Sequence, residues 1–367
     1  MKILILANND VGLYQFRQEL IAELLKDHNV YISLPYGQLV EPLRKMGCKF
    51  IDTPVDRRGI NPKTDFSLLL NYKKIIKKVK PNLVITYTIK PNIYGGIVCR
   101  LMKIPYAVNI TGLGTAFQKH GALRKLVTTM YKVSLKKAKV VFFENCGNQQ
   151  LFIDEKIVPE YKACLLNGAG VNLEHYSYQD YPMDTDEIRF LFVGRVMKEK
   201  GINELFKAMR MLRKTGVNCT LDVLGGYEEN YEGIIHRFEN EGWLHYHGYQ
   251  EDVRPFIKNC HCFVLPSWHE GMANTNLECA SSGRPVITTN IHGCLEAVVD
   301  GESGFLCEKQ DAKSLYTVMK QMTTLSTERR RDMGIAGRKH MEDVFDKKKV
   351  VEDTMSMINY SKMKREK

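Results

Sequence analysis

Two glutamates, Glu270 and Glu278, lie eight positions apart in the stretch PSWHEGMANTNLE. The run CHCFVLPS, which leads into this stretch, is short, apolar and closed by a proline, and this predicts a buried strand. The run NTNLECASSG predicts a helix that has Asn274 as its N-cap and ends at Gly283. Glu270 is then expected in the strand-to-helix loop, and Glu278 about one turn inside the helix.

The start of that predicted helix suits a phosphate group. Its first backbone N–H groups have no partner inside the helix, and the helix dipole favours an anion there. A crevice with phosphate-binding donors in its middle and a carboxylate on each side fits a sugar nucleotide. One acid can hold the ribose hydroxyls and the other the sugar.

Charged residues also follow another predicted strand, in the stretch VGRVMKEKG. Arg195 offers a fork of guanidinium donors and Lys200 an ammonium group, a combination that suits a diphosphate. Either residue alone fits a solvated loop, but the two together on a loop that leaves a buried strand favour an anion site. After the first strand of the chain, Gly12 permits a ligand to approach the backbone closely, as a glycine does in most turns of this kind.

Length and composition favour a two-domain protein of the cytoplasm. The chain has 367 residues, of which 44% are hydrophobic, enough for a sizeable core. The run MKILILANND fits a first strand, not a secretion signal, and no run approaches the roughly 20 apolar residues of a membrane-spanning helix. The 10 cysteines follow no disulfide-framework spacing, which favours reduced thiols.

The net charge of +11 is concentrated in the first half of the chain. Residues 1–178 hold 26 Lys and Arg against 13 Asp and Glu, whereas the rest hold 27 against 29. Two candidate helices, 67–80 and 122–139, each carry an apolar face and a lysine-rich face. Solvated helix faces explain this pattern, and so does a surface that docks on anionic lipid. No zinc-finger spacing or aromatic RNA-binding signature accompanies the charge, so nucleic acid is not expected as a partner.

Strands and helices alternate along the whole chain. Many predicted strands are continuous apolar runs, as in parallel sheets covered on both faces, and this predicts an α/β fold with two doubly wound domains. Facing one another, two such domains form a central crevice at the carboxyl ends of their strands. The polar segment 173–187 is predicted to link domain 1–172 to domain 188–346. The predicted strands are 2–7, 30–35, 49–54, 82–88, 106–111, 139–144, 162–167, 188–194, 219–225, 244–248, 262–266, 285–290 and 304–307.

Five motifs in the second half resemble those of family 4 glycosyltransferases. VGRVMKEKG, HGYQEDV, VLPSWHEGMANTNLE, GRPVITT and GCLEAVVDGESGFL occur in the order and spacing of that family. NITGLGTAF and NGAGVNLEHY are similar to the N-terminal motifs of bacterial enzymes that assemble capsule, O-antigen and other surface glycans. The resemblance implies the GT-B fold, with two Rossmann-like domains, and a last helix, about 347–367, that packs back on the N-terminal, acceptor-side domain.

The same resemblance implies the chemistry and the roles of the residues. It implies metal-independent transfer of a hexose from a nucleoside diphosphate with retention of the anomeric configuration, and it makes uridine the expected base. Glu270 corresponds to the family's contact with the donor sugar, Glu278 to its contact with the ribose, and Arg195 and Lys200 to its diphosphate-binding pair. No cofactor or metal is implied. The expected donor-binding residues are Gly12, Gly170, Arg195, Lys200, Tyr249, Gln250, Glu270, Gly271, Met272, Ala273, Asn274, Thr275 and Glu278, with Glu270, Arg195 and Lys200 as the catalytic set.

The sequence departs from the family pattern in two places. Many members carry a histidine near the position of Thr111, so no catalytic imidazole is assigned, and Asn109 and Thr111 are expected to contact the sugar or the acceptor. The turn that follows LDVL is GGYEEN rather than the commoner glycine-spaced form. This departure leaves the roles of Gly225 and Gly226 open.

Several other residues are expected to be structural. Cys260, His261 and Cys262 invite a zinc hypothesis, but zinc needs about four ligands, and core thiols in a strand explain these residues better. His245 and His247 lie on the same side of a short predicted strand, with no acid near them in the sequence. The region 327–350 has charges at helical spacing and is predicted to form a solvated pair of helices.

The expected reaction is a front-face displacement that the leaving phosphate assists, because no residue stands out as a covalent nucleophile. The expected acceptor is a glycan linked to a polyprenyl diphosphate, at the inner face of the cell membrane. Two alternatives remain open. A sugar-nucleotide epimerase on the same fold needs an acid and a base beside the sugar, and a non-catalytic membrane-associated assembly protein needs only the crevice.

Overall fold

The computed structural model describes residues 1–56, 59, 61–117, 121–183 and 186–363. Its internal contacts divide the chain into two units, Met1–Ala169 together with the chain from Lys348 onward, and Gly170–Lys347. Each unit has its own parallel sheet. The thirteen strands that the apolar runs predict are all present, each within about two residues of the predicted bounds. The prediction of an α/β fold with two doubly wound sheets is therefore confirmed.

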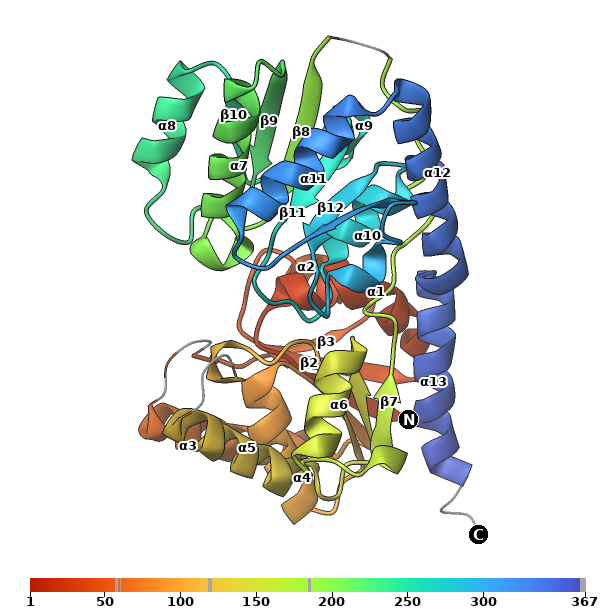
Figure 1. The fold of residues 1–367 in the computed structure, drawn as a ribbon. Helices are drawn as coiled ribbons and strands as arrows, with labels where there is room; N and C mark the ends of the chain where they lie inside the picture. Colours follow the sequence, from red (N-terminus) through yellow and green to blue (C-terminus); the bar gives the residue numbers. More distant parts are fainter. Residues whose placement is uncertain (57–58, 60, 118–120, 184–185, 364–367) are drawn as a thin grey trace. The chain divides into compact units, whose positions relative to one another are not determined.

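The first unit is built on seven parallel strands in the order β3-β2-β1-β4-β5-β6-β7 (Figure 1). Helices α1 (Asp10–Asp27), α2 (Val40–Lys45) and α13 (Lys347–Met363) share one core with one face of the sheet. Helices α3 (Pro62–Val79), α4 (Gly96–Leu101), α5 (Ala122–Leu135) and α6 (Cys146–Asp154) supply the other core. The strands are β1 (Lys2–Leu6), β2 (Asn29–Leu34), β3 (Lys49–Asp52), β4 (Leu83–Tyr87), β5 (Tyr106–Ile110), β6 (Val140–Phe143) and β7 (Ala163–Leu165), and the short helical turns are η1 (Pro91–Gly95), η2 (Thr115–Phe117) and η3 (Glu160–Lys162).

The second unit is built on six parallel strands in the order β10-β9-β8-β11-β12-β13. The strands are β8 (Ile188–Val193), β9 (Cys219–Leu224), β10 (Leu244–Gly248), β11 (Cys262–Leu265), β12 (Val286–Thr289) and β13 (Gly304–Cys307). The helices are α7 (Ile202–Lys214), α8 (Glu232–Asn240), α9 (Arg254–Asn259), α10 (Asn274–Ser281), α11 (Ala312–Thr324) and α12 (Thr327–Val344), with short turns η4 (Lys198–Lys200) and η5 (Leu295–Ala297). Helix α12 is followed directly by α13, so two helices occur where a solvated pair was predicted for 327–350. That range holds only the start of α13, and both helices have buried positions, such as Met333 and Met341 of α12 and Val350 of α13.

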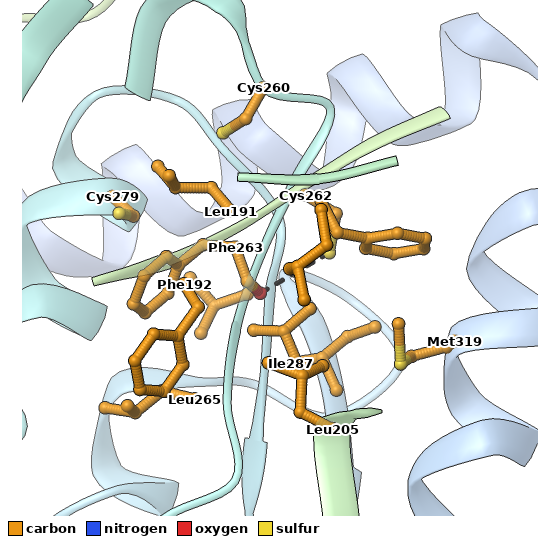
Figure 2. Close-up of a cluster of buried hydrophobic side chains, with 14 of the residues drawn as sticks. Leu191, Phe192, Leu205, Cys260, Cys262, Phe263, Leu265, Cys279, Ile287 and Met319 are labelled. Atoms are coloured by element: carbon orange, nitrogen blue, oxygen red, sulfur yellow. Dashed lines mark hydrogen bonds between the residues drawn. The ribbon is translucent and has the colours of Figure 1, made fainter. Parts of the chain in front are cut away.

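The cysteines that suggested a metal site lie in the hydrophobic core of the second unit. Figure 2 shows Cys260 and Cys262 among large apolar side chains such as Phe192 and Phe263. Both thiols are buried. The ring of the buried His261 accepts a hydrogen bond at Nδ1 from the backbone N–H of Arg189, at 3.0 Å. The prediction that these residues are structural is confirmed.

The segment that the sequence suggested as a linker is attached to the second unit. The guanidinium of the buried Arg284 donates hydrogen bonds to the carbonyl oxygens of Gln179, at 3.1 Å, and Asp180, at 2.7 Å. The hydroxyl of Tyr181 donates to the carbonyl oxygen of His261 at 2.9 Å. Backbone carbonyls that lie outside any strand are thus satisfied by one buried arginine.

Both sheets reverse their strand order once, and these positions are where open α/β sheets bind ligands. In the first unit the reversal lies between β1 and β4, and in the second between β8 and β11. The loops that leave β8 and β11 carry the residues singled out in the sequence. No helix in the described part of the chain combines the length and the apolar character needed to span a bilayer.

Candidate active site

The candidate active site of the second unit lies at the carboxyl ends of β8 and β11. These two strands are neighbours in the sheet, with Cys262 opposite Phe190 and Phe263 opposite Leu191. Two loops therefore leave the sheet side by side, residues 194–201 after β8 and 266–273 after β11. The motifs that contain Arg195 and Glu270 are far apart in the sequence and become adjacent through this strand pairing.

Lys200 and Glu270, two of the predicted catalytic residues, form a direct ion pair. The Lys200 ammonium contacts Oε1 of Glu270, and both side chains are largely buried. A lysine that holds one carboxylate still has donors for a second anion, since an ammonium group offers three. The pair therefore places a cation and an anion side by side at the strand-order reversal, which suits a ligand with a negatively charged and a polyhydroxylated part.

The two loops are held together by contacts that sequence analysis missed. Gly201 has a positive φ of 72°, and a side chain there would overlap the carbonyl oxygen of Pro266. Only glycine allows the Lys200 loop to lie directly on the end of β11. The backbone N–H of Trp268 donates to the carbonyl oxygen of Glu199 at 2.9 Å, and the His269 ring lies 3.2 Å from the Glu199 carboxylate. The sequence signal that could have indicated this close contact is the glycine directly after Lys200.

Arg195 lies at the start of the same loop and pairs with another acid. Its guanidinium is 3.2 Å from the carboxylate of Glu228, which belongs to the GGYEEN turn after β9. In that turn Gly225 has a φ of 134°, and a side chain there would overlap the carbonyl oxygen of Gly194. The role that the sequence left open for Gly225 is therefore close packing of the β8 and β9 loops. Gly226 accepts a hydrogen bond from the Val196 backbone N–H at 2.9 Å.

Helix α10 begins one residue earlier than predicted. Asn274 is its first helical residue, and Ala273, which has no side chain that could cap, occupies the N-cap position. The prediction of Asn274 as the N-cap is wrong, because the backbone N–H of Ala273 bonds the Gly293 carbonyl at 2.7 Å and fixes the chain one residue earlier. Gly283, with a φ of 78°, follows the last turn as predicted.

Three polar atoms near this helix start are buried and have no hydrogen-bond partner among the described residues. They are Oδ1 of Asn274, Oγ of Ser267 and Nε1 of Trp268. An unsatisfied buried polar group costs about 1–3 kcal/mol, and such groups collect where a polar ligand can satisfy them. Neighbouring Gly271, Met272 and Ala273 are buried, and Thr275 is half-buried.

Glu278 lies in the second turn of α10, in a different environment from Glu270. Burial raises the pKa of the Glu278 carboxyl to about 7, although the Lys347 charge and a hydrogen bond from Tyr176 act in the opposite direction. The two acids of the opening motif are thus distinguished by their surroundings. Glu270 is paired with a lysine, whereas burial disfavours the charged form of Glu278.

The raised pKa predicts how Glu278 affects stability. Between pH 4.5 and 7 the unfolded chain has released this proton and the folded chain still holds it, so unfolding releases a proton and stability falls as pH rises. The Glu278→Gln variant lacks this pH-dependent contribution to stability. We expect its melting temperature, relative to the parent, to be lowest near pH 5 and to rise by a few degrees near pH 8. Glu302→Gln, an exposed acid of the same unit, serves as the control and should show no such trend. A pH-independent difference for Glu278→Gln would contradict the raised pKa.

The remaining predicted donor-binding residues of the second unit lie outside the two loops that follow β8 and β11. Tyr249 is exposed after β10, and the Gln250 amide donates to the His247 carbonyl at 2.6 Å. Gly170 is packed against Lys347, whose Cα would lie 2.7 Å from an added side-chain carbon, and its φ is 68°. This packing requires glycine at position 170 whether or not the residue also lines a donor site.

His247 has an acidic partner that its sequence neighbours did not suggest. Its Nε2 lies 2.6 Å from Oδ1 of Asp222 on β9, and its ring packs on Phe256 with centroids 4.7 Å apart. His245 is exposed. Because β9 and β10 pair in parallel, the strand register supplies the acid across 25 residues of sequence.

In the first unit, the predicted contacts Gly12, Asn109 and Thr111 lie after or within the strands next to the reversal. The Gly12 backbone N–H donates to Oδ1 of the N-cap Asn9 at 2.6 Å, which fixes the start of α1. The buried Asn109 amide donates to the Thr86 carbonyl at 3.2 Å. Thr111 follows β5 directly and is half-buried.

The carboxyl edge of the first sheet also holds two features that sequence analysis missed. Arg17 of α1 and Glu144, which follows β6, form a buried ion pair, and the Arg17 guanidinium lies 5.3 Å from the Tyr87 ring centroid. Thr88, directly after β4, has a φ of 72°, a strained conformation for a β-branched residue. Strain and buried charge collect at functional sites, so both features mark this edge of the sheet.

Two families match the chain, one in each half. The family described as "Glycosyl transferase 4-like" matches residues 2–145, and the family described as "Glycosyl transferases group 1" matches residues 177–340. Together these ranges include every residue of the Lys200–Glu270 site and the strand-order reversals of both units.

Curated relatives and solved structures agree with this assignment. The chain is 28% identical, over 86% of its length and 87% of the relative's, to N,N'-diacetylbacillosaminyl-diphospho-undecaprenol alpha-1,3-N-acetylgalactosaminyltransferase of Campylobacter jejuni. It is also 28% identical, over 72% of both chains, to UDP-Gal:alpha-D-GlcNAc-diphosphoundecaprenol alpha-1,3-galactosyltransferase of Escherichia coli. The fold matches Anabaena Alr3699/HepE, solved in complex with UDP and glucose, with a TM-score of 0.81, 15% identity and coverage of 98% and 100% of the two chains.

Proposed function

Because this chain belongs to the family 4 glycosyltransferases of the GT-B fold, we propose that it moves a hexose from a UDP-sugar to a polyprenyl-diphosphate-linked glycan. It is a glycosyltransferase of surface-glycan biosynthesis. The observation that carries the finer proposal is the Lys200–Glu270 ion pair at the strand-order reversal. That pair brings a cation for the diphosphate and a carboxylate for the sugar into contact.

The proposed transfer is a front-face displacement with retained configuration. The bond between the anomeric carbon and the diphosphate oxygen breaks, and its electron pair stays on the leaving diphosphate. The acceptor hydroxyl attacks the same face of the sugar, and its proton passes to the leaving phosphate oxygen. Lys200, Arg195 and the first N–H groups of α10 stabilise the negative charge that develops there. These groups are sufficient in charge to make the reaction independent of a divalent metal ion.

The two acids have different roles in this proposal. Glu270 holds hydroxyls of the donor sugar and orients the ring as it gains positive character. Glu278 holds the ribose, which is bound in the same way before and during the reaction. The ion pair with Lys200 holds the Glu270 side chain in place before the donor arrives, so its carboxylate is already positioned as a hydrogen-bond acceptor.

The nature of donor and acceptor is inferred from the relatives. The printed names of the C. jejuni and E. coli relatives both contain a diphospho-undecaprenol acceptor, and the E. coli name contains UDP-Gal. A lipid-linked acceptor fits the excess of positive charge in residues 1–178, and we place the protein at the inner face of the cell membrane. The epimerase alternative lacks support from the matched families, and a non-catalytic role does not explain the retained Lys200–Glu270 pair.

The test is transfer from a panel of nucleotide sugars to polyprenyl-diphosphate-linked acceptors. We expect release of nucleoside diphosphate that depends on the acceptor, an α-linked product from an α-linked donor, and unchanged rates in excess chelator. Release of an epimerised sugar nucleotide without acceptor would assign the alternative enzyme class. A strict requirement for magnesium or manganese would contradict the role of Lys200 and Arg195 at the leaving group.

A further inference from the structure

The segment that follows β4, residues 88–95, carries a lysine to which the proposed reaction gives no role. Strand β4 borders the strand-order reversal of the first unit, the position at which open α/β sheets bind ligands. Lys90 is the third residue after this strand, and its ammonium donates a hydrogen bond to Oδ1 of Asp65 in α3 at 2.7 Å. Both side chains are only 14% exposed. A cation paired with one acid thus lies near the reversal of the first sheet, as Lys200 and Glu270 do at that of the second.

Both oxygens of the Asp65 carboxylate are used to hold this segment. Oδ2 accepts a hydrogen bond from the Tyr94 hydroxyl at 2.9 Å. Burial and this hydrogen bond raise the pKa of Tyr94, so the hydroxyl stays protonated and remains a donor to Asp65. The Lys90 ammonium offers three donors, and Asp65 is its one hydrogen-bond partner among the described residues. The acid therefore orients the ammonium and leaves it with donors for another anion.

The backbone that presents Lys90 has an unusual conformation. The strained Thr88, with its φ of 72°, accepts a hydrogen bond at its carbonyl oxygen from the Asn92 backbone N–H at 2.9 Å. The next turn, η1 (Pro91–Gly95), is a π-helix, a rare form that occurs mostly as a single turn and frequently at functional sites. Such features persist where the rest of the fold enforces them, so the lysine is presented by a segment shaped for more than its own stability.

The lysine segment is fixed against the end of β5, where contacts with the acceptor are expected. Strands β4 and β5 pair in parallel, and the Asn92 amide donates to the Asn109 carbonyl oxygen at 2.8 Å. A side-chain carbon added at Gly114 would lie 2.7 Å from Cδ1 of Ile89, so the loop after β5 packs directly on the residue that precedes the lysine. Asn109 and Thr111, predicted to contact the sugar or the acceptor, therefore lie on the strand and loop next to this segment.

Stability alone does not account for the Lys90–Asp65 pair. Taking two charges out of water costs about as much as their attraction returns, so a largely buried ion pair is weak evidence for a structural role. A ligand site gives the pair another purpose, because an ammonium that is already held in place binds an anion with little further loss of side-chain entropy. Lysine is a common ligand of phosphate groups, to which it presents a compact charge.

We propose that Lys90 binds the diphosphate of the lipid-linked acceptor, and that Asp65 is the positioning residue that aims its ammonium. This inference rests on the proposed function, in which the acceptor is a polyprenyl-diphosphate-linked glycan. Asn109 and Thr111 are then left for the sugar of that acceptor. The diphosphate does not react and is bound in the same way throughout the transfer, so Lys90 contributes to acceptor binding and not to the chemical step.

Steady-state kinetics with two acceptors test this assignment. One acceptor is the accepted sugar on a short isoprenyl diphosphate, and the other is the octyl glycoside of the same sugar, which has no diphosphate. With the first, Lys90→Met should raise the acceptor KM about ten- to a hundredfold and change kcat little, because a hydrogen bond to a charged group is lost. With the second, parent and variant should have equal KM values. Lys90→Arg keeps the charge and should recover part of the affinity.

The matched control is Lys162→Met. Lys162 is also partly buried in the first unit and donates to the Lys136 carbonyl oxygen at 2.9 Å. It directly precedes β7, at the amino edge of the sheet, so its variant should have the parent's KM with both acceptors. The double variant Lys90→Met, Asp65→Asn leaves no unpaired carboxylate and replaces the single variant if that variant does not fold.

A binding measurement without sugar transfer provides the second test. The protein is saturated with UDP, which occupies the diphosphate site of the second unit, and is titrated in a calorimeter with geranyl diphosphate or inorganic diphosphate. Lys90→Met should weaken the binding of both at least about tenfold. Geranyl diphosphate should bind at least as tightly as inorganic diphosphate. Binding of inorganic diphosphate alone would overturn the assignment to a lipid-linked acceptor.

The outcomes separate this inference from the proposed function. An equal loss with both acceptors, or binding of geranyl diphosphate that ignores Lys90→Met, would overturn the inference alone. Lys90-dependent binding of geranyl diphosphate by a parent that transfers no sugar would overturn the proposed function alone.

Discussion

The Glu270→Gln variant is expected to transfer sugar about ten to a hundred times more slowly than the parent in a single turnover, because a hydrogen bond to a charged group is worth about 1.5–3 kcal/mol. The lost interaction acts on the sugar, whose shape and charge change in the transition state, so the loss should fall on turnover. The variant also releases the Lys200 ammonium from its ion pair. Binding of the nucleoside diphosphate should therefore be as tight as in the parent, or tighter.

The matched comparison uses the other acid of the motif and a remote ion pair. Glu278→Ala should weaken donor binding by about one to two decades and change the single-turnover rate little, since the ribose contact is uniform through the reaction. Glu328→Gln removes the carboxylate of an exposed pair with Arg331 on α12, 3.8 Å apart, and should affect neither quantity. Parent-like transfer by Glu270→Gln would remove Glu270 from the sugar site.

A double-mutant cycle tests whether Lys200 and Glu270 act as a unit. Lys200→Ala alone leaves a largely buried carboxylate without its cation and removes a donor from the diphosphate, so it should reduce both binding and turnover. The further loss caused by Lys200→Ala in the Glu270→Gln background should be smaller, because the uncompensated carboxylate is absent. Simple additivity would show that the two side chains contribute independently.

The largest expected effect on stability lies in the first unit. Replacement of Arg17 by Met, or of Glu144 by Leu, should lower the free energy of unfolding by about 3–5 kcal/mol, because each leaves an unpaired charge in a buried position. Desolvation raises the pKa of Glu144 and the Arg17 guanidinium counteracts it, so the acid depends on its partner to remain ionised. The double variant should lose clearly less than the sum of the two single variants.

Urea unfolding followed by circular dichroism measures this effect. The control is Arg44→Met, which removes one member of an exposed pair with Glu41 in α2, 2.9 Å apart, and should cost no more than about 1 kcal/mol. Two single variants with parent-like midpoints would show that the Arg17–Glu144 pair contributes nothing to the fold. Equal losses in the singles and the double would show that the pair acts only as a unit.

The elements of the fold followed from the sequence because their signals are local. Continuous apolar runs predicted the strands, since a strand buried on both faces has no polar positions. The stop at Gly283 and the core positions of Cys260 and Cys262 followed from equally short patterns, whereas the family resemblance implied the last helix, which begins at Lys347. The family motifs then named Glu270, Glu278, Arg195 and Lys200 before any geometry was known.

The partners of these residues were decided by the tertiary structure alone. Lys200 meets Glu270 across 70 residues because β8 and β11 are neighbours at the strand-order reversal. Arg17 of α1 meets Glu144, which follows β6, across 127 residues, although two strands separate β1 from β6 in the sheet. His247 meets Asp222 through strand register. No local pattern encodes which strands pair, because pairing is fixed by packing the whole sheet between its two helix layers. The raised pKa of Glu278 likewise depends on burial that only the folded chain provides, and Lys347 and Tyr176, which counteract the increase, reach this carboxyl only when the chain folds.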